Sequence, residues 1–451
     1  MQRPVSSTRE LVHLAWPMLV AQLAMMANAV IDTAMAGRLS AIDLAAVGIA
    51  ASIMATVLMS LVSVLLALPP IIAHLYGAGK RADIGREMHQ GIWISLMLAL
   101  VAILLLRFPG PFIAISELQP AVEIKVRAYL AASSWGVPAA FALRLFFGLS
   151  MGVGRPRPVM FFNLLSLAIK VPLNALFMYG LSGLPAMGAP GAAVATSADA
   201  WLMALLAWAW CLNHPEYAAF DLRRRFVAPN LAAIREFLKF GIPIGLTFIA
   251  DVTAFTFMAL FIARLGPVIS GAHQIAANLA ALAFMIPLSL GNATSILVGQ
   301  ALGGGQPARA RRISWEGIRL GMTIAGVLCL IFWLGAPQIA SFYTTDHRVQ
   351  AMAMPLPLIT MVGLYHLGDA LQAVTVNALR GYKKSVVPMV IYTVTLWVPG
   401  LGGGIVLGLT NTFGPARGAP GFWLAAIASI WMVGALMALY LNAISKKYCA
   451  R

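Results

Sequence analysis

Twelve apolar segments, each long enough to cross a bilayer, constrain the fold of this chain more than any other feature. They cover about residues 11–35, 44–70, 90–113, 128–150, 158–180, 190–212, 240–264, 271–299, 317–340, 350–378, 386–410 and 420–444. A helix that spans the core of a bilayer needs about 20 apolar residues. Only 10% of the 451 residues are charged, whereas a soluble domain carries about 25%. We therefore predict an all-α integral membrane protein with twelve transmembrane helices.

The two halves of the sequence repeat each other at a shift of about 226 residues. The matches that carry weight are Pro17 with Pro243, Trp201 with Trp431, and Gly188-Ala189-Pro190-Gly191 with an identical run at 418–421. Six spans return the chain to its starting side, so the two repeats should be parallel. We predict an N-terminal six-helix lobe over 1–212, a cytoplasmic linker over 213–239 and a C-terminal six-helix lobe over 240–451. Two similar lobes around a shared site are typical of secondary transporters.

The basic residues are distributed unevenly between the loops. The net charge is +16, and 22 of the 31 lysines and arginines fall in alternate loops, against seven in the opposite loops. Basic loops face the cytoplasm in membrane proteins, so we predict a multi-pass inner-membrane protein with both termini in the cytoplasm. Topology accounts for the excess of positive charge, and we expect no nucleic-acid partner.

A short set of ionisable residues lies inside the predicted spans. Its members are Asp32, Arg144, Lys170, Asp199, Asp251 and Asp369, with His366 near the last. A carboxylate at the centre of a bilayer costs roughly 2.5–3.5 kcal/mol. We therefore expect the carboxylates within the spans to have a functional role. The alternative is that they form structural ion pairs with Arg144 or Lys170.

Asp251 and Asp369 lie in the seventh and tenth predicted spans. On a helix, Asp251 shares a face with Thr247 and Phe255, and Asp369 shares one with Tyr365, His366 and Gln372. Two carboxylates that face one cavity repel each other when both are ionised, so either can take up a proton or both can share a Na⁺ ion. A catalytic carboxylate pair is the competing interpretation, but no further cluster of active-site polar residues accompanies it.

Asp32 ends the first predicted span on a helical face that also carries Asn28 and Met25. The methionine pattern predicts either a cavity that adapts to varied apolar ligands or ordinary packing. Lys170 and Asn174, one turn apart in the fifth span, are candidate partners of Asp32. A buried pair between Lys170 and Asp32 is the structural alternative to a cation site in this half.

Several short motifs, taken together, resemble the multidrug and toxic compound extrusion (MATE) family, of the NorM type. They are Val30 to Gly37 around Asp32, Pro243-Ile244-Gly245-Leu246 ahead of Asp251-Val252-Thr253, Gly363-Leu364-Tyr365 through Asp369, Leu379-Arg380-Gly381-Tyr382-Lys383, Tyr76-Gly77-Ala78-Gly79, and Val171-Pro172-Leu173-Asn174. The resemblance covers essentially the whole chain. It implies two six-helix lobes and the export of bulky, often cationic, amphipathic compounds driven by inward movement of Na⁺ or H⁺.

The resemblance also suggests roles for individual residues. It places the coupling cation, Na⁺ or H⁺, at Asp251 and Asp369 with Tyr365, and a first-lobe carboxylate at Asp32. Helical spacing adds Thr247, one turn before Asp251, as a further cation-coupling candidate. NorM-like sequences commonly carry Glu where this chain has Asp251, and a neutral polar residue where it has Lys170, whose charge would compete with Na⁺ near Asp32. The candidates for the substrate cavity are Asp32, Asn28, Met25, Lys170, Asn174, Phe255, Met258, His366 and Gln372.

We therefore predict a monomeric antiporter of organic cations and amphipathic drugs in a lipid membrane, without a cofactor. A lipid-linked saccharide flippase of the same superfamily is the nearest rival, but its anionic substrate calls for a basic cavity, and the intramembrane candidates here are mainly acidic. A membrane-embedded hydrolase would need a nucleophile with a base, or a metal cluster, and no second histidine accompanies His366 at ligand spacing.

Overall fold

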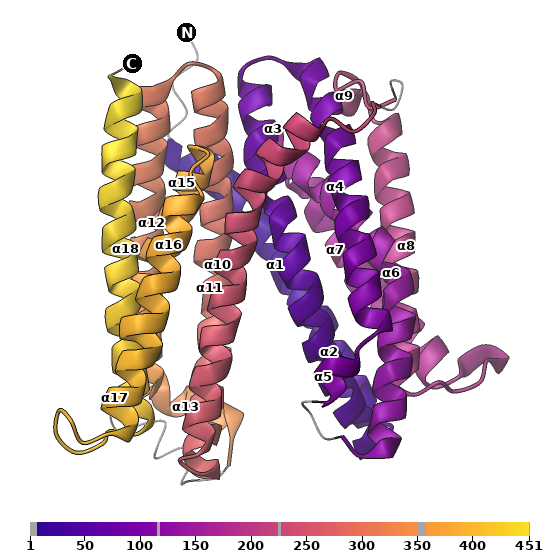
Figure 1. Ribbon diagram of the computed structural model, residues 1–451, viewed down its shortest axis with the longest axis vertical. Coiled ribbons are helices and arrows are strands. Elements are labelled where there is room, and N and C mark those ends of the chain that lie inside the picture. Colours follow the sequence, from indigo (N-terminus) through magenta and orange to yellow (C-terminus); the bar gives the residue numbers. More distant parts are fainter. Residues whose placement is uncertain are drawn as a thin grey trace. The chain divides into compact units, whose positions relative to one another are not determined.

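The computed structural model describes residues 7–114, 118–223, 227–345, 347, 349 and 358–450, and within these residues the ordered elements are all helical (Figure 1). The chain forms two compact units, Pro17–Gly245 and Met1–Trp16 with Leu246–Arg451. Two helices have residues in both units, α1 (Ser7–Gly37) and α10 (Leu231–Ala263). We refer to Pro17–Gly245 as the N-unit and to the other as the C-unit.

The N-unit contains, besides its parts of α1 and α10, five long helical segments within the described residues, the first of them built from α2, η1 and α3, and several short ones. These are α2 (Ala41–Val62), the 3₁₀ turn η1 (Ser63–Ala67), α3 (Leu68–Gly77), α4 (Arg81–Arg107), α5 (Gly110–Ala114), α6 (Pro120–Gly152), α7 (Arg157–Met178), η2 (Leu181–Gly183), α8 (Ala189–Asn213) and α9 (Pro215–Ala218). The loop with η2 extends away from the helices of its unit (Figure 1). Of the expected linker 213–239, residues 231–239 belong to α10, and 224–226 lie outside the described residues.

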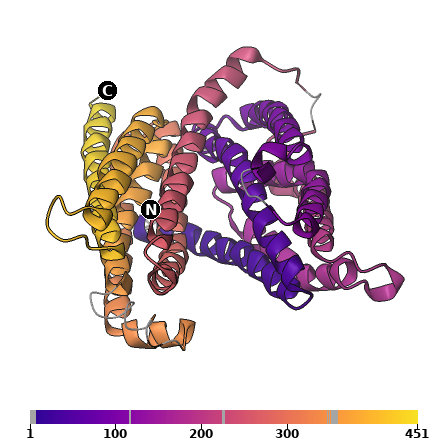
Figure 2. The same cartoon turned by 60° about the horizontal axis from the view of Figure 1, so that its bottom comes forward.

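Within the described residues, the C-unit continues from α10 with five more long segments, one of them built from α16, η3 and α17, and the short helix α13. They are α11 (Pro267–Gly303), α12 (Pro307–Leu334), α13 (Ala336–Tyr343), α15 (Leu358–Gly381), α16 (Val386–Thr395), the π-helical segment η3 (Leu396–Gly402), α17 (Gly403–Leu409) and α18 (Ala419–Cys449). Helix α13 runs at an angle to the end of α12 (Figure 2).

Eleven helical segments of the described chain are long and apolar enough to cross a membrane. The remaining predicted span is the tenth, 350–378, and corresponds to α15. This helix is 24 residues long but falls short in hydropathy because it carries Tyr365, His366, Asp369 and Gln372. The first part of that predicted span, 351–357, lies outside the described residues. The prediction of an all-α membrane protein with twelve spans is confirmed.

The polar character of α15 follows from its position in the C-unit. It packs against three neighbours, α11, α12 and α18, so most of its side chains face protein instead of lipid. In the N-unit, α6 has the same role and packs chiefly against α8 and α4. The two tryptophans matched by the internal repeat each connect a neighbouring helix to one of these central helices. Trp201 Nε1 of α8 donates to the Trp135 carbonyl of α6 at 2.9 Å. Trp431 Nε1 of α18 donates to the Leu364 carbonyl of α15 at 3.1 Å.

The repeated Gly-Ala-Pro-Gly run begins α8 and α18 with the same backbone geometry. Gly188 has φ 62° and ψ −136°, and Gly418 has φ 60° and ψ −140°, a region that side chains other than glycine rarely adopt. In the N-unit, Asp43 fixes this start, because its Oδ1 accepts hydrogen bonds from the Ala189 N–H at 2.8 Å and from Lys125 Nζ at 2.6 Å.

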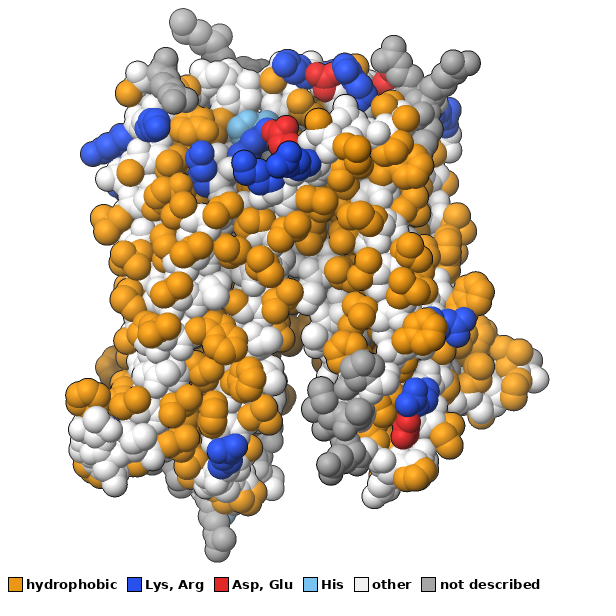
Figure 3. Space-filling model, in the orientation of Figure 1, with side chains coloured by type: hydrophobic (Ala, Val, Ile, Leu, Met, Phe, Trp, Pro, Cys, Tyr) orange, Lys and Arg blue, Asp and Glu red, His pale blue; other side chains and the backbone are white. Residues whose placement is uncertain are grey.

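The surface separates into an apolar belt and a basic end. In Figure 3, hydrophobic side chains cover the middle of each unit, while lysine and arginine side chains gather mainly toward one end of its helices. Exposed apolar residues such as Leu205 (63%), Leu260 (58%) and Leu439 (68%) belong to this belt. Large apolar surface of this extent is stable in lipid.

Candidate cation site

Two carboxylates lie close together in the C-unit. Asp251 on α10 accepts a hydrogen bond from the Tyr392 hydroxyl on α16 at 2.5 Å. Asp369 on α15 is only 6% exposed. The Phe255 ring, one turn after Asp251, meets the Tyr365 ring, one turn before Asp369, so the two carboxylates lie in one region of the C-unit. A buried carboxylate next to a half-buried one needs a proton or a cation to offset the charge of the pair.

Aromatic rings line one side of this carboxylate pair. The Tyr365 ring, one turn before Asp369, meets the Phe255 ring edge to face with centroids 6.0 Å apart. On its other side it meets the Trp423 ring of α18 at 5.7 Å. These contacts fix the orientation of Tyr365.

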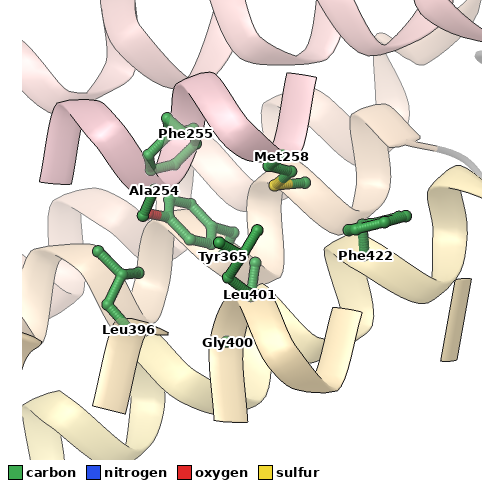
Figure 4. A pocket seen from close by; sticks show the side chains of 9 residues that line it. Ala254, Phe255, Met258, Tyr365, Leu396, Gly400, Leu401 and Phe422 are labelled. Carbon is green, nitrogen blue, oxygen red and sulfur yellow. The ribbon is translucent and has the colours of Figure 1, made fainter. Parts of the chain in front are cut away.

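A small cavity lies beside these rings (Figure 4). Its volume is about 20 Å³, which accommodates a water molecule but not a drug-sized compound. It is lined by Ala254, Phe255, Met258, Tyr365, Leu396, Gly400, Leu401, Phe422 and Ala426. Two predicted cavity residues, Phe255 and Met258, are therefore at its wall. The π-helical segment contributes Leu396, Gly400 and Leu401, and Pro399 lies within it.

The other predicted residues of this half take different positions. Thr247 is half-buried one turn before Asp251. His366 is 1% exposed, and its ring lies 6.5 Å from that of Phe332 on α12. Gln372 is buried on α15, 6% exposed. The structure thus brings Asp251, Asp369, Tyr365, Phe255 and Met258 to one region of the C-unit.

In the N-unit, Asp32 is held by the two partners that its spacing suggested. Lys170 Nζ lies 2.9 Å from Asp32 Oδ2, and Asn174 Nδ2 donates to Asp32 Oδ1 at 2.7 Å. Lys170 is 2% exposed and also donates to the Thr196 hydroxyl on α8. The structural alternative of a buried ion pair is therefore present, and the lysine ammonium stands where a cation would bind Asp32.

A second set of polar contacts lies next to this ion pair. Asn28 Nδ2 donates to Ser166 Oγ at 3.1 Å, and Ser166 Oγ donates to Asp199 Oδ2 at 2.6 Å. Within the described residues, Asp199 Oδ1 is buried without a hydrogen-bond partner. Met25 accepts a weak contact from Arg144 Nη2, at 3.9 Å from its sulfur. Asn28 and Met25 thus face polar neighbours of the N-unit.

Sequence reasoning missed several of these contacts. Tyr392 is not among the site residues predicted from the sequence, although it is the one tyrosine in the span 386–410. Trp423 and Ser166 are not among the predicted site residues either, because a single aromatic or hydroxyl residue in an apolar helix is usually a packing residue. Asp199 was recognised only as a costly charge, and its contact with Ser166 depends on the packing of α7 against α8.

The comparison with protein families matches both halves of the chain. The MatE family profile matches residues 17–176 and, separately, residues 243–404. The two matches start 226 residues apart, at Pro17 and Pro243, as the internal repeat requires. The duplication of the fold is therefore also a duplication of the family unit.

Relatives extend over nearly the full chain. The "Probable multidrug resistance protein NorM" of Chromobacterium violaceum is 39% identical over 445 residues, 98% of this chain and 95% of that protein. The "Multidrug resistance protein MdtK" of Edwardsiella ictaluri is 36% identical over 442 residues, 97% of this chain and 96% of that protein.

Solved structures show the same fold at lower identity. The eukaryotic MATE transporter AtDTX14 superimposes with a TM-score of 0.84 at 18% identity, over 98% of both chains. The bent form of the Vibrio cholerae MATE transporter VcmN gives 0.83 at 17% identity, also over 98% of both chains. The chain therefore belongs to the multidrug and toxic compound extrusion (MATE) family and is a membrane transporter of the NorM type, not an enzyme.

Proposed function

We propose that this chain exports bulky amphipathic, often cationic, compounds across the inner membrane in exchange for Na⁺ or H⁺, by alternating access. The observation that carries the proposal is the pair of carboxylates within the C-unit, the buried Asp369 and the half-buried Asp251, which the contact of Phe255 with Tyr365 brings to one region. The printed names of the NorM and MdtK relatives, which are called multidrug resistance proteins, support the class of substrate.

The proposed coupling follows from the charge of the pair. Two ionised carboxylates in an apolar region destabilise the packed C-unit unless a cation or proton offsets them. Binding of the coupling ion thus stabilises the arrangement of α10, α15 and α16, in which Tyr392 donates to Asp251. Release of the ion leaves negative charge that attracts a cationic substrate. Ion and substrate then compete for one acidic site, which is the condition for exchange.

We propose that coupling is confined to the C-unit. In the N-unit, the Lys170 ammonium already lies 2.9 Å from Asp32, so a Na⁺ ion would have to displace a covalently attached cation. Tyr365 and Thr247 supply further oxygens near the C-unit carboxylates, and backbone carbonyls or water complete the coordination. We favour Na⁺ on the family resemblance, with H⁺ as the alternative that the same carboxylates can carry.

The first experiment uses purified protein in liposomes loaded with a fluorescent organic cation. An imposed Na⁺ gradient at equal pH on both sides should drive substrate movement. If only a pH gradient drives movement and Na⁺ has no effect, the coupling ion is H⁺. If neither gradient drives movement of any cationic compound, the antiport proposal fails.

The matched variants are Asp369→Asn and Asp251→Glu. Asp369→Asn keeps the shape of the side chain but cannot exchange a cation, so coupled transport should be lost while expression and thermal unfolding stay near wild type. Asp251→Glu keeps the charge and should retain activity. Wild-type coupled transport in Asp369→Asn would remove this residue from the mechanism.

A further inference from the structure

A basic cavity lies on the C-unit, apart from the carboxylate pair. Its volume is about 680 Å³, and its wall is formed by one side of α12 with the end of α18. The lining residues are Ala308, Arg311, Arg312, Trp315, Glu316, Arg319 and Cys449. Three arginines and a tryptophan thus share one cavity at the basic end of the helices.

The positive charge of this cavity is only partly compensated. Glu316 accepts a hydrogen bond from Arg312 Nε at 2.8 Å. Arg311 donates instead to a neutral group, the Asn442 amide oxygen, at 3.3 Å. Arg319 is an exposed side chain at the rim. Among the described residues that line the cavity, one carboxylate therefore stands against three guanidinium groups, which leaves a surplus of two positive charges.

The internal repeat provides a built-in comparison. At a shift of 226 residues, Arg311, Glu316 and Arg319 correspond to Gly85, Gln90 and Trp93 of α4. There the same helix face is covered by the chain itself. Gln90 Nε2 donates to the Ala228 carbonyl and Trp93 Nε1 to the Val227 carbonyl, both at 3.1 Å.

Gly85 completes this cover in the N-unit. A Cβ atom at Gly85 would lie within hard contact of the Phe220 carbonyl, so only glycine lets residues 220–221 pack so closely. In the C-unit, the equivalent position is Arg311, and the face is a cavity. The same face is thus covered by chain in one unit and lined by arginine in the other.

The exposed side of α12 continues from the arginines into apolar surface. Val327, Leu330 and Leu334 are 54%, 54% and 79% exposed. At about 100° per residue, all three lie within about 80° of Arg319 around the helix. At a rise of about 1.5 Å per residue, Val327 is about 12 Å along the helix from Arg319. An anionic group at the arginines would therefore be joined to apolar chains along this face.

We infer that this cavity binds the phosphodiester headgroup of an anionic phospholipid. Guanidinium groups bind phosphate through two parallel hydrogen bonds, and tryptophan favours the boundary between headgroups and acyl chains. Basic pockets between membrane helices are suited to anionic lipid headgroups. The acyl chains would lie along Val327, Leu330 and Leu334.

The test titrates phosphatidylglycerol against purified protein in detergent and counts bound lipid by native mass spectrometry. The wild type should bind one phosphatidylglycerol in preference to phosphatidylethanolamine. In Arg311→Gln/Arg319→Gln this affinity should fall about thirtyfold, because each basic residue contributes about one kcal/mol near an anionic lipid. The control is Arg81→Gln/Arg86→Gln on α4, which removes the same charge and should bind as the wild type.

Three outcomes would overturn the inference: unchanged affinity in Arg311→Gln/Arg319→Gln, an equal loss in the α4 control, or full competition by millimolar inorganic phosphate, which would identify a soluble phosphate ligand. Arg319→Gln alone serves if the double variant does not fold, because this side chain is exposed, and it should still weaken phosphatidylglycerol binding severalfold.

Discussion

Replacing Lys170 by methionine tests whether the N-unit depends on its internal cation. Methionine keeps the length and apolar stem of the lysine side chain. Asp32, whose side chain is 14% exposed, then keeps the Asn174 amide as its one hydrogen-bond donor among the described residues. Removing one partner of a buried ion pair costs about 3–5 kcal/mol. For a unit of this size, one kcal/mol lowers the midpoint of thermal unfolding by about 2–4 °C. We expect Lys170→Met to lower the apparent Tm by about 6–20 °C.

The double variant Asp32→Asn/Lys170→Met removes both charges. It should recover most of the lost Tm, because exchanging a buried pair for neutral groups is often close to neutral. Arg127→Met is the matched control, since its pair with Glu123 at 2.7 Å is exposed and such pairs contribute at most about 1 kcal/mol. All four proteins are compared by thermal unfolding in the same detergent.

Two results would refute this reasoning. If Lys170→Met unfolds at the wild-type temperature, the ion pair does not stabilise the N-unit. If the double variant is as unstable as Lys170→Met, the lysine acts through its packing or its contact with Thr196, and not through the charge of Asp32.

Three further predictions concern the coupling site, the fold and the topology. Tyr392→Phe keeps the ring but removes a hydrogen bond to a carboxylate, worth about 1.5–3 kcal/mol, so ion-driven transport in liposomes should fall at least about tenfold; unchanged transport would exclude the hydroxyl. Asp43→Asn should lower the apparent Tm by several degrees, because it removes a charge-assisted contact that is worth about 1.5–3 kcal/mol; an unchanged Tm would contradict this. Single cysteines at Arg223 and Gly414 in a cysteine-free background should react with an impermeant reagent from opposite sides of the membrane; reaction of both in intact cells would refute the topology.

The apolar pattern predicted the number and type of the helices better than their ends. A span is recognised by its lipid-facing residues, whereas a helix continues past the bilayer wherever its backbone can be capped. Helix α4 therefore begins at Arg81, nine residues before the predicted span 90–113. Helix α10 begins at Leu231, inside the expected linker. The π-helical segment around Pro399 has no counterpart in the hydrophobic pattern.

The candidate site was predictable where its residues share one helix. Spacing alone put Tyr365 and Asp369 on one face of α15. The Tyr392 contact with Asp251 joins residues 141 positions apart, and no local rule reports such a contact. The pair of Lys170 with Asp32 was foreseeable at a similar separation because two opposite charges in an apolar environment stabilise each other strongly. The contact of Lys170 with a neutral partner such as Thr196 cannot be predicted from the sequence in this way.

The ion pair of the N-unit has a consequence for the response to membrane voltage. A lysine and an aspartate that move together carry no net charge through the electric field, whatever path their helices follow. A single carboxylate that crosses a full membrane potential of 100 mV changes its electrostatic free energy by about 2.3 kcal/mol. The Lys170–Asp32 pair therefore does not respond to the membrane potential when it moves. Neutralising Lys170 would leave the negative charge of Asp32 uncompensated, and movement of the N-unit would then depend on voltage.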